Sequence, residues 1–508
     1  MTPLRATFLA APTPPGISAI TNRIAPLLLL VISYALLAGC ATNPVTGGQD
    51  FVTMSEQNEI ALGRRASQEV MKHYRAYDDQ RLQAYIQRIG ADLARHSHRP
   101  GLIYRFTLLD STEVNAFALP GGYIYITRGI LAYLNSEAEL AAVLGHEIGH
   151  VAARHAVRQQ SAATIANLGA TLGAVLFPQL GTQSARQLVQ LGGAAILRGY
   201  GREYELEADR LGAEYLARSG YSPRAMIAVL RTLKAQEGFE RQRAKAEGRE
   251  PHIYHGLFAT HPDNDTRLQQ VIAAAARLRP KTVRKTTRAA FLPRLEGLVY
   301  GDSPHDGIRR GNAFYHADLG FALHFPPGWT VLNRPDRLLA TAPRNAGLIQ
   351  IAMEDLNRRI SPARFMRERL HLEQLQDGRP MVLKDLQGYT GLARINTAYG
   401  TRLARFCVIY LDRRAFIIAG VAKDPRQAAA LDTRILASAR SFHRLTAAER
   451  QLAKPLRLHI IAASAGTRFA ELARRSPIPD YAEARLRLLN GLYPGGEPAP
   501  GQLLKDVQ

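Results

Sequence analysis

The chain has 508 residues, 46% of them hydrophobic, which is enough to build about three domains with hydrophobic cores of their own. It carries 65 Lys and Arg against 43 Asp and Glu, a formal net charge of +22. This excess is scattered without a dense basic block interleaved with aromatic residues, so we expect no nucleic-acid binding. Because only two cysteines occur, no disulfide framework is expected either.

The N-terminus resembles a bacterial lipoprotein signal. Residues 24–37 form an apolar run that has the length of a signal-peptide core and is too short to cross a bilayer comfortably. The run leads into Leu-Ala-Gly-Cys40, which resembles the lipobox, whose cysteine is lipidated. We expect a signal peptide at 1–39, lipidation of Cys40 and a tether at 40–54. The protein would then be anchored on the periplasmic side of the outer membrane, with a membrane-spanning anchor as the alternative.

Two helices and a small strand unit are expected after the tether. Ser55 is a candidate N-cap for the first helix, and a second helical pattern spans residues 79–96. Residues 104–109 alternate like a strand, and residues 115–127 predict two strand segments around a Pro-Gly-Gly turn.

An extended segment beside a catalytic helix can offer its edge to a peptide substrate through backbone hydrogen bonds. Asn115, Ala116 and Phe117 are therefore candidate substrate-edge residues. A generic hairpin without any role in binding is the alternative.

The clearest chemical motif is His146-Glu147-x-x-His150. Ser136 and Glu139 form a candidate capping box ahead of it, which places the histidines in the middle of a helix. Residues four apart lie on one face of a helix, so the two imidazoles can bind one metal ion while Glu147 acts as a general base. A pair of buried histidines hydrogen-bonded to the backbone is the alternative.

A candidate third ligand lies in a helix predicted at residues 203–218. Glu205 and Asp209 share one face of this helix. Because each helical residue turns by about 100°, Glu207 points away from that face. Catalytic zinc sites use three protein ligands and leave the fourth position for water. Glu205 is the candidate third ligand and Asp209 the candidate partner that orients a ligand histidine, with a solvated acidic face as the alternative.

Two further segments belong near the candidate site. Residues 159–185 contain no charged residue, and we expect apolar helices or a loop covering the active-site cleft, with a transmembrane helix as the alternative. Residues 260–267 contain a His-Pro turn, from which His261 and Arg267 could hold developing oxyanion charge. A simple capping turn is the default interpretation of that segment.

The predicted fold class is α+β. We expect a mainly helical zinc metalloprotease domain with a small sheet at 55–280, a basic linker at 281–299 and an α/β domain at 300–446. A tail at 456–508 is predicted to have the order strand, helix, helix, strand and resembles a LysM-type module. Peptidoglycan is therefore a candidate partner, and a purely structural tail is the alternative. Within the α/β domain Cys407 is expected to be a buried thiol.

Taken together, the motifs resemble metallopeptidase family 48, which includes the CAAX prenyl endopeptidase, HtpX and the periplasmic BepA-like proteases. The resemblance spans about residues 50–280 and rests on five segments in the family's order: the helix containing Glu59 to Gly63, residues 115–127, the His146 motif, Glu205 to Asp209, and His261-Pro262 with Arg267. It implies one Zn²⁺ per chain, and it implies that His261 is a gating zinc ligand or a transition-state donor. The chain departs from the BepA-like proteases in lacking tetratricopeptide repeats after the protease domain.

The sequence thus predicts a zinc-dependent endopeptidase of the cell envelope. Its substrates would be peptide bonds in periplasmic or outer-membrane proteins, cleaved for processing or quality control. The rival prediction is a gated or inactive chaperone or peptidoglycan-binding lipoprotein, in which His261 permanently occupies the metal.

Overall fold

The computed structural model describes residues 40–163, 200–251 and 264–508, apart from residues 53, 249, 281, 285, 335, 336 and 398. The predicted signal peptide, most of the uncharged segment 159–185 and the candidate residue His261 lie outside the described residues. Within the described chain, no helix is both long and apolar enough to cross a membrane.

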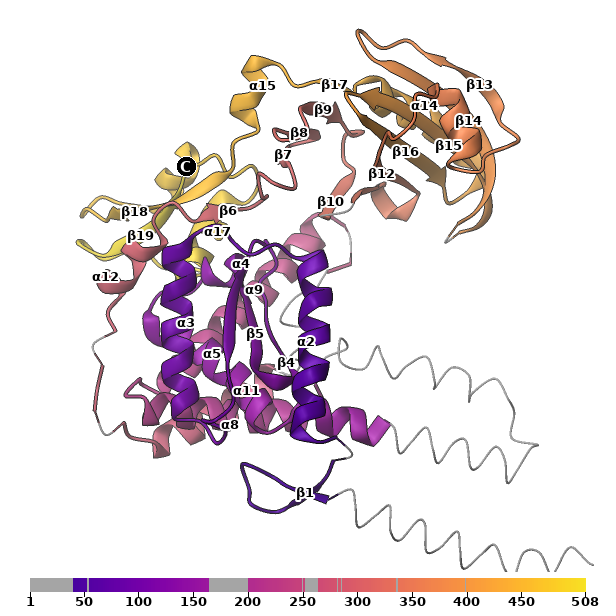
Figure 1. Cartoon of the computed structure of the whole chain (residues 1–508). Helices are drawn as coiled ribbons and strands as arrows, with labels where there is room; N and C mark the ends of the chain where they lie inside the picture. Colours follow the sequence, from indigo (N-terminus) through magenta and orange to yellow (C-terminus); the bar gives the residue numbers. More distant parts are fainter. Residues whose placement is uncertain are drawn as a thin grey trace, which may run out of the picture.

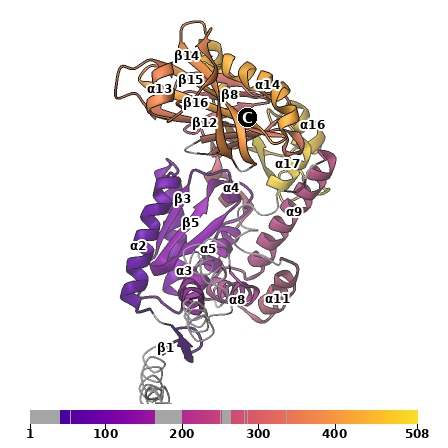
Figure 2. The ribbon, with the colours of Figure 1, turned by 90° about the vertical axis from the view of Figure 1, so that its right-hand side faces the viewer.

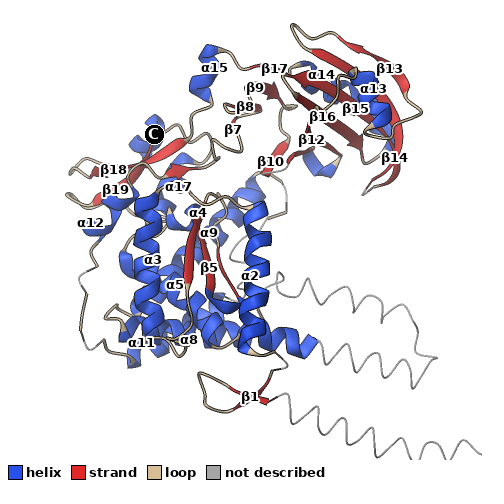
Figure 3. Ribbon diagram, viewed as in Figure 1, coloured by secondary structure: helices blue, strands red, loops and turns tan. Residues whose placement is uncertain are grey.

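The first region of the chain builds a three-stranded sheet with helices packed against it (Figures 1 and 3). Its strands are β3 (Arg105–Leu109), β4 (Ala116–Leu119) and β5 (Tyr123–Thr127), in the order β3-β5-β4. The strand β5 pairs parallel with β3 and antiparallel with β4, so β4 lies at an edge. The strand segments predicted around the Pro-Gly-Gly turn are confirmed, and the turn itself is the 3-10 helix η1 (Pro120–Gly122).

The helices of this region begin at side-chain caps. They are α2 (Glu56–His73), α3 (Gln80–Arg95), α4 (Arg128–Leu131) and α5 (Glu137–Ala152). The Ser55 hydroxyl accepts the N–H of Asn58, and the Ser136 hydroxyl accepts the N–H of Glu139. The Glu139 carboxylate accepts the N–H of Asn135 and so closes the start of α5. The helix α5 is buried along almost its whole length and forms the centre of the core.

Three more helices follow: α8 (Arg202–Arg218) and α9 (Arg224–Ala246), which pack on α5, and α11 (Asn264–Arg277), which packs on α8 and α9. The helix α8 lies against α5 at a distance that only a glycine allows, since a Cβ added to Gly149 would meet the Ala208 carbonyl oxygen at 2.9 Å. This close contact brings the polar side chains of the two helices together inside the core.

A β-rich region follows, and its largest sheet has seven strands in the order β10-β11-β12-β16-β15-β14-β13. The strands are β10 (Thr330–Arg334), β11 (Arg337–Thr341), β12 (Gly347–Asp355), β13 (Gln376–Met381), β14 (Gln387–Thr397), β15 (Gly400–Leu411) and β16 (Arg414–Ala422). All of its pairings are antiparallel, and tight hairpins join β14 to β15 and β15 to β16. The expectation of an α/β domain at 300–446 is therefore corrected to an antiparallel sheet with packed helices.

Those helices are α13 (Pro362–Glu368) and α14 (Ala428–Arg440), which pack in separate hydrophobic clusters. Cys407 on β15 is a buried free thiol, as expected. A second sheet, in the order β17-β9-β8-β7, adjoins this region. Its strands are β7 (Ile308–Arg310), β8 (Ala313–His316), β9 (Phe321–His324) and β17 (His443–Arg444), and α15 (Ala447–Leu452) follows it.

The tail has the predicted order: β18 (Leu456–Ala462), α16 (Phe469–Arg475), α17 (Ala482–Leu489) and β19 (Leu503–Val507). It returns to the first region and shares its hydrophobic core (Figure 2). The buried Lys505 ammonium donates to the carbonyl oxygens of Ala132 and Leu134, at 2.6 and 2.9 Å, just ahead of α5. The segment at 281–299 also contributes, with α12 (Arg288–Phe291) in the core and β6 (Val299–Tyr300) paired to β18.

The packing of α2 on η1 gives a stability prediction. A Cβ added to Gly63 would lie 1.8 Å from the Pro120 carbonyl oxygen, so Gly63→Ala should lower the free energy of unfolding by about 1–3 kcal/mol or more. The control Gly238→Ala, in α9, places its Cβ where no heavy atom lies within 4 Å and should be neutral or stabilising by up to about 1 kcal/mol. Thermal unfolding of both variants checks this, and equal melting temperatures would contradict the described contact.

Candidate metal centre

The contact between α5 and α8 brings the three predicted ligands together. The Nε2 atoms of His146 and His150 lie 3.0 Å apart. One carboxylate oxygen of Glu205, on α8, lies 3.5 Å from the His146 Nε2, and the other lies 3.4 Å from the His150 Nε2. All three side chains are buried, and their ligand atoms lie within 4.8 Å of one another. Such convergence of two imidazoles and a carboxylate is typical of a metal site.

Each ligand histidine has a partner on its second ring nitrogen. The Nδ1 atom of His146 lies 2.8 Å from the Asp209 carboxylate, and the Nδ1 atom of His150 lies 2.8 Å from the Nδ1 atom of His155. Both networks are satisfied when the Nδ1 atoms of His146 and His150 carry the proton and donate, because this leaves both Nε2 lone pairs for a metal. The residues therefore fit Zn²⁺, with two nitrogen ligands, one oxygen ligand and a fourth position for water.

The charges around His146 form a buried network. The Arg267 guanidinium, on α11, donates to Asp209 at 2.7 and 2.8 Å, and its Nη1 lies 3.2 Å from Glu205. Burial would raise the pKa of Asp209, but the neighbouring guanidinium outweighs it and holds the pKa below its usual value. Burial likewise disfavours the charged form of His146, yet the hydrogen bond to Asp209 raises its pKa to about 9. Arg267 thus contacts the carboxylates, whereas the sequence suggested a contact with substrate oxyanion.

Glu147 and Tyr200 lie beside the ligands. Glu147 is fully buried next to His146 on α5, and Tyr200 stacks on the His150 ring with centroids 4.1 Å apart. Burial together with the nearby carboxylates of Glu147 and Glu205 raises the pKa of the Tyr200 phenol, so this tyrosine remains protonated. The carboxylate of the base candidate Glu147 is therefore close enough to affect the Tyr200 phenol, as that of the ligand Glu205 does.

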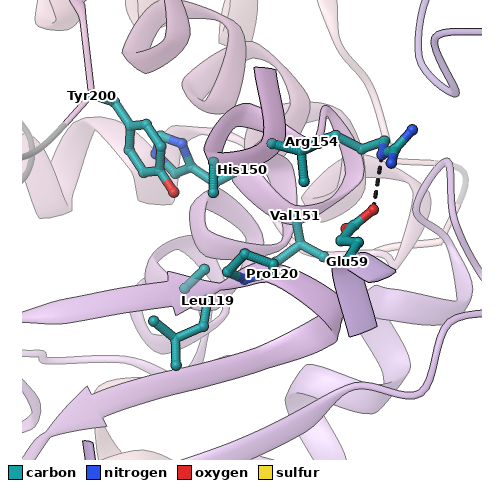
Figure 4. Close-up of a pocket in the computed structure, with 10 residues that line it drawn as sticks. Glu59, Leu119, Pro120, His150, Val151, Arg154 and Tyr200 are labelled. Carbon is teal, nitrogen blue, oxygen red and sulfur yellow. Dashed lines mark hydrogen bonds and ion pairs between the residues drawn. The ribbon is translucent and has the colours of Figure 1, made fainter. Parts of the chain in front are cut away.

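A pocket opens beside His150 (Figure 4). The end of β4 and η1 contribute Ala118, Leu119 and Pro120 to its lining, which also includes Glu59, Val151, Arg154 and Tyr200. The candidate substrate-edge residues Asn115, Ala116 and Phe117 lie earlier on the same edge. Asn115 and Ala116 are buried there, and Phe117 stacks on Tyr125 with ring centroids 5.0 Å apart.

Sequence reasoning missed the partner of His150. His155 is fully buried, and its Nε2 lies 3.1 Å from the Glu207 carboxylate, which also accepts from Arg158 at 2.9 Å. Burial lowers the pKa of His155, and the hydrogen bond from His155 lowers the pKa of Glu207 to about 2. The sequence does show a third histidine, His155, shortly after the motif. The direction of its side chain could not be predicted, because it depends on how α5 ends.

Residues 80–275 match the model of peptidase family M48. We refer to these matched residues as the M48 domain. Its two histidines, its glutamate base candidate and the carboxylate ligand on α8 all lie within the matched residues, whereas α2 and the N-terminal segment precede them.

Three relatives illustrate the similarity of the M48 domain. Over 274 residues the chain is 29% identical to the beta-barrel assembly-enhancing protease of Escherichia coli (strain K12), covering 53% of this chain and 54% of that protein. Over 163 residues it is 35% identical to the mitochondrial metalloendopeptidase OMA1 of Arabidopsis thaliana, covering 32% of each. Over 257 residues it is 24% identical to the metalloprotease YcaL of Escherichia coli (strain K12), covering 48% of this chain and 94% of that one. The chain thus spans about half the length of the first of these relatives.

The raised pKa of His146 predicts proton-linked metal binding by the M48 domain. Because the His146 imidazole is charged up to about pH 9, both of its ring nitrogens carry a proton at neutral pH. Zinc must then displace the proton on Nε2. Apparent zinc affinity should rise up to about tenfold per pH unit from neutral pH to the pKa and level off above it.

Asp209→Asn tests the cause of this dependence. The variant removes the carboxylate that raises the pKa of His146, so the pH dependence should flatten and the limiting affinity should fall by about 10- to 100-fold. Calorimetric titration in buffers of different ionisation enthalpy measures both the affinity and the protons released. Equally steep dependence in the two proteins would contradict the assignment.

Proposed function

We propose that the protein is a zinc-dependent endopeptidase of the cell envelope that hydrolyses peptide bonds in periplasmic or outer-membrane proteins. The observation that carries the proposal is the convergence of His146, His150 and Glu205, with Glu147 on the same turn of α5, inside an M48 domain. Buried ligands on two packed helices form a preorganised site, which hydrolytic chemistry requires.

The residues then have distinct roles. When bound, Zn²⁺ supplies acidified water at neutral pH and polarises the scissile carbonyl. Glu147 accepts the proton of the attacking water and delivers it to the leaving amine nitrogen. Asp209 and Arg267 hold His146 and Glu205 in place. His261 is our candidate for the oxyanion contact and for gating, because the Arg267 guanidinium contacts two carboxylates.

The substrate class is proposed from the relatives and the N-terminus. The name of the Escherichia coli relative connects that protein with β-barrel assembly, which agrees with an envelope substrate here. We propose that Cys40 is lipidated and anchors the protein to the outer membrane from the periplasmic side, as its lipobox-like sequence suggests. The strand–helix–helix–strand tail is proposed as a LysM-like module with peptidoglycan as a partner, supported by its order of elements.

The role of Glu147 gives the direct test of activity. Glu147→Gln keeps the size of the side chain but removes the base, so peptide cleavage should fall by about 10²- to 10⁴-fold while one zinc ion per chain is retained. Casein hydrolysis and metal analysis of the same preparation measure the two effects. The control Glu203→Gln, an exposed position on α8, should cleave casein like the parent protein. Undiminished cleavage by the Glu147 variant would contradict the mechanism, and an inactive parent protein would favour the chaperone alternative.

A further inference from the structure

The N-terminal hairpin lies outside the matched M48 residues yet contacts the region of the metal site. It consists of β1 (Cys40–Thr42) and β2 (Gln49–Phe51), which pair antiparallel. Figures 1 and 2 both show β1 at the end of the domain away from the seven-stranded sheet. The Asp50 carboxylate lies 3.3 Å from the Arg158 Nε, and the Met54 carbonyl accepts from Arg154 at 2.8 Å.

A continuous series of polar contacts runs from this hairpin to a metal ligand. Arg158 donates to the Glu207 carboxylate at 2.9 Å, and the same carboxylate oxygen lies 3.1 Å from the His155 Nε2. The Nδ1 atom of His155 then lies 2.8 Å from the Nδ1 atom of His150. Each contact fixes the next side chain, so the position of Asp50 is linked through three side chains to the ring orientation of His150.

The backbone between the two histidines needs this support. Arg154 follows the end of α5 with a φ of +56°, a left-handed conformation that costs energy in a residue other than glycine. Its guanidinium is held by the buried Glu59 carboxylate at 2.8 Å, as the dashed line in Figure 4 shows. The turn at Arg154 directs His155 back onto His150, and the contacts from the N-terminal side hold the turn in place.

Hydrogen bonds within the hairpin fix the position of Asp50. The buried Asn43 side chain donates to the Asp50 carboxylate at 2.7 Å, and its oxygen accepts the N–H groups of Val45 and Thr46 in the connecting turn. Asp50 is thus fixed from the hairpin side as well as by Arg158. A loosely attached tether would not require such a turn-capping network.

We propose that the N-terminal hairpin is a positioning element of the metal centre, in which Asp50 acts through Arg158, Glu207 and His155 to fix the ring of His150. The proposal rests on the proposed function only in taking His146, His150 and Glu205 as metal ligands. The segment next to the proposed lipid anchor is then part of the active-site scaffold, and its docking sets metal affinity and ligand geometry.

The test uses the full chain with Co²⁺ as the probe, because the visible spectrum of bound Co²⁺ reports ligand geometry without requiring activity. His155→Phe removes the direct partner of His150 and should weaken Co²⁺ binding by about tenfold or more and change the spectrum. Asp50→Ala should weaken it by about threefold, the size expected for a partly exposed ion pair. The control Gln49→Ala, at the exposed neighbouring position of β2, should match the parent protein.

A double-mutant cycle separates coupling from general loosening. If Asp50 acts through Arg158, the effects of Asp50→Ala and Arg158→Gln on Co²⁺ affinity should be less than additive, because either change alone breaks the same connection. Additive effects, or parent-like affinity and spectrum in Asp50→Ala, would overturn the proposal. Since the readout is metal binding, these outcomes are independent of casein hydrolysis, which tests the proposed function separately.

Discussion

The packing of α8 on α5 is the constraint on which the metal centre depends. The two histidines come from one helix, and Glu205 and Asp209 come from the other, so no ligand described here is supplied by a loop. Because helical residues turn by about 100° each, a one-residue shift of α8 would rotate both carboxylates away from the histidines. The small residues at the contact, Gly149 against Ala208, allow an approach close enough for the ligand atoms to converge.

This convergence places several charged side chains in the core, and neighbouring arginines stabilise the buried carboxylates by ion pairing. A buried carboxylate without a partner is strongly destabilising, and the structure avoids this by placing Arg267 against both Asp209 and Glu205. A second buried cluster lies at the C-terminal end of α5, where Glu59 binds Arg154 and Arg99, and Arg99 donates to the Val151 carbonyl oxygen. The first cluster connects α5 through α8 to α11, and the second connects the end of α5 to α2.

Helical periodicity was sufficient to predict the parts of the site that lie within single helices. It placed His146 and His150 on one face, paired Glu205 with Asp209, and directed Glu207 away from the metal ligands. It could not predict the role of His155, because the direction of that side chain depends on the left-handed turn at Arg154. The contact of Asp50 with Arg158 joins segments far apart in the sequence, and no local pattern reveals such a pair.

The same limit explains the error in the β-rich region. The prediction expected both strands and helices in this region, and both occur there, but the pattern of a strand does not contain the direction of its neighbour. The tail illustrates the converse case, since its order of elements was predicted from local patterns, whereas its shared core with the M48 domain depends on tertiary packing.

Anomalous X-ray scattering at the zinc edge, from crystals of the zinc-loaded full chain, tests the central claim most directly. We expect one zinc ion per chain, with the Nε2 atoms of His146 and His150 at about 2.0–2.1 Å and a Glu205 oxygen at about 2.0–2.2 Å. A zinc ion bound elsewhere, or bound at the histidines without Glu205, would contradict the assignment of the metal centre.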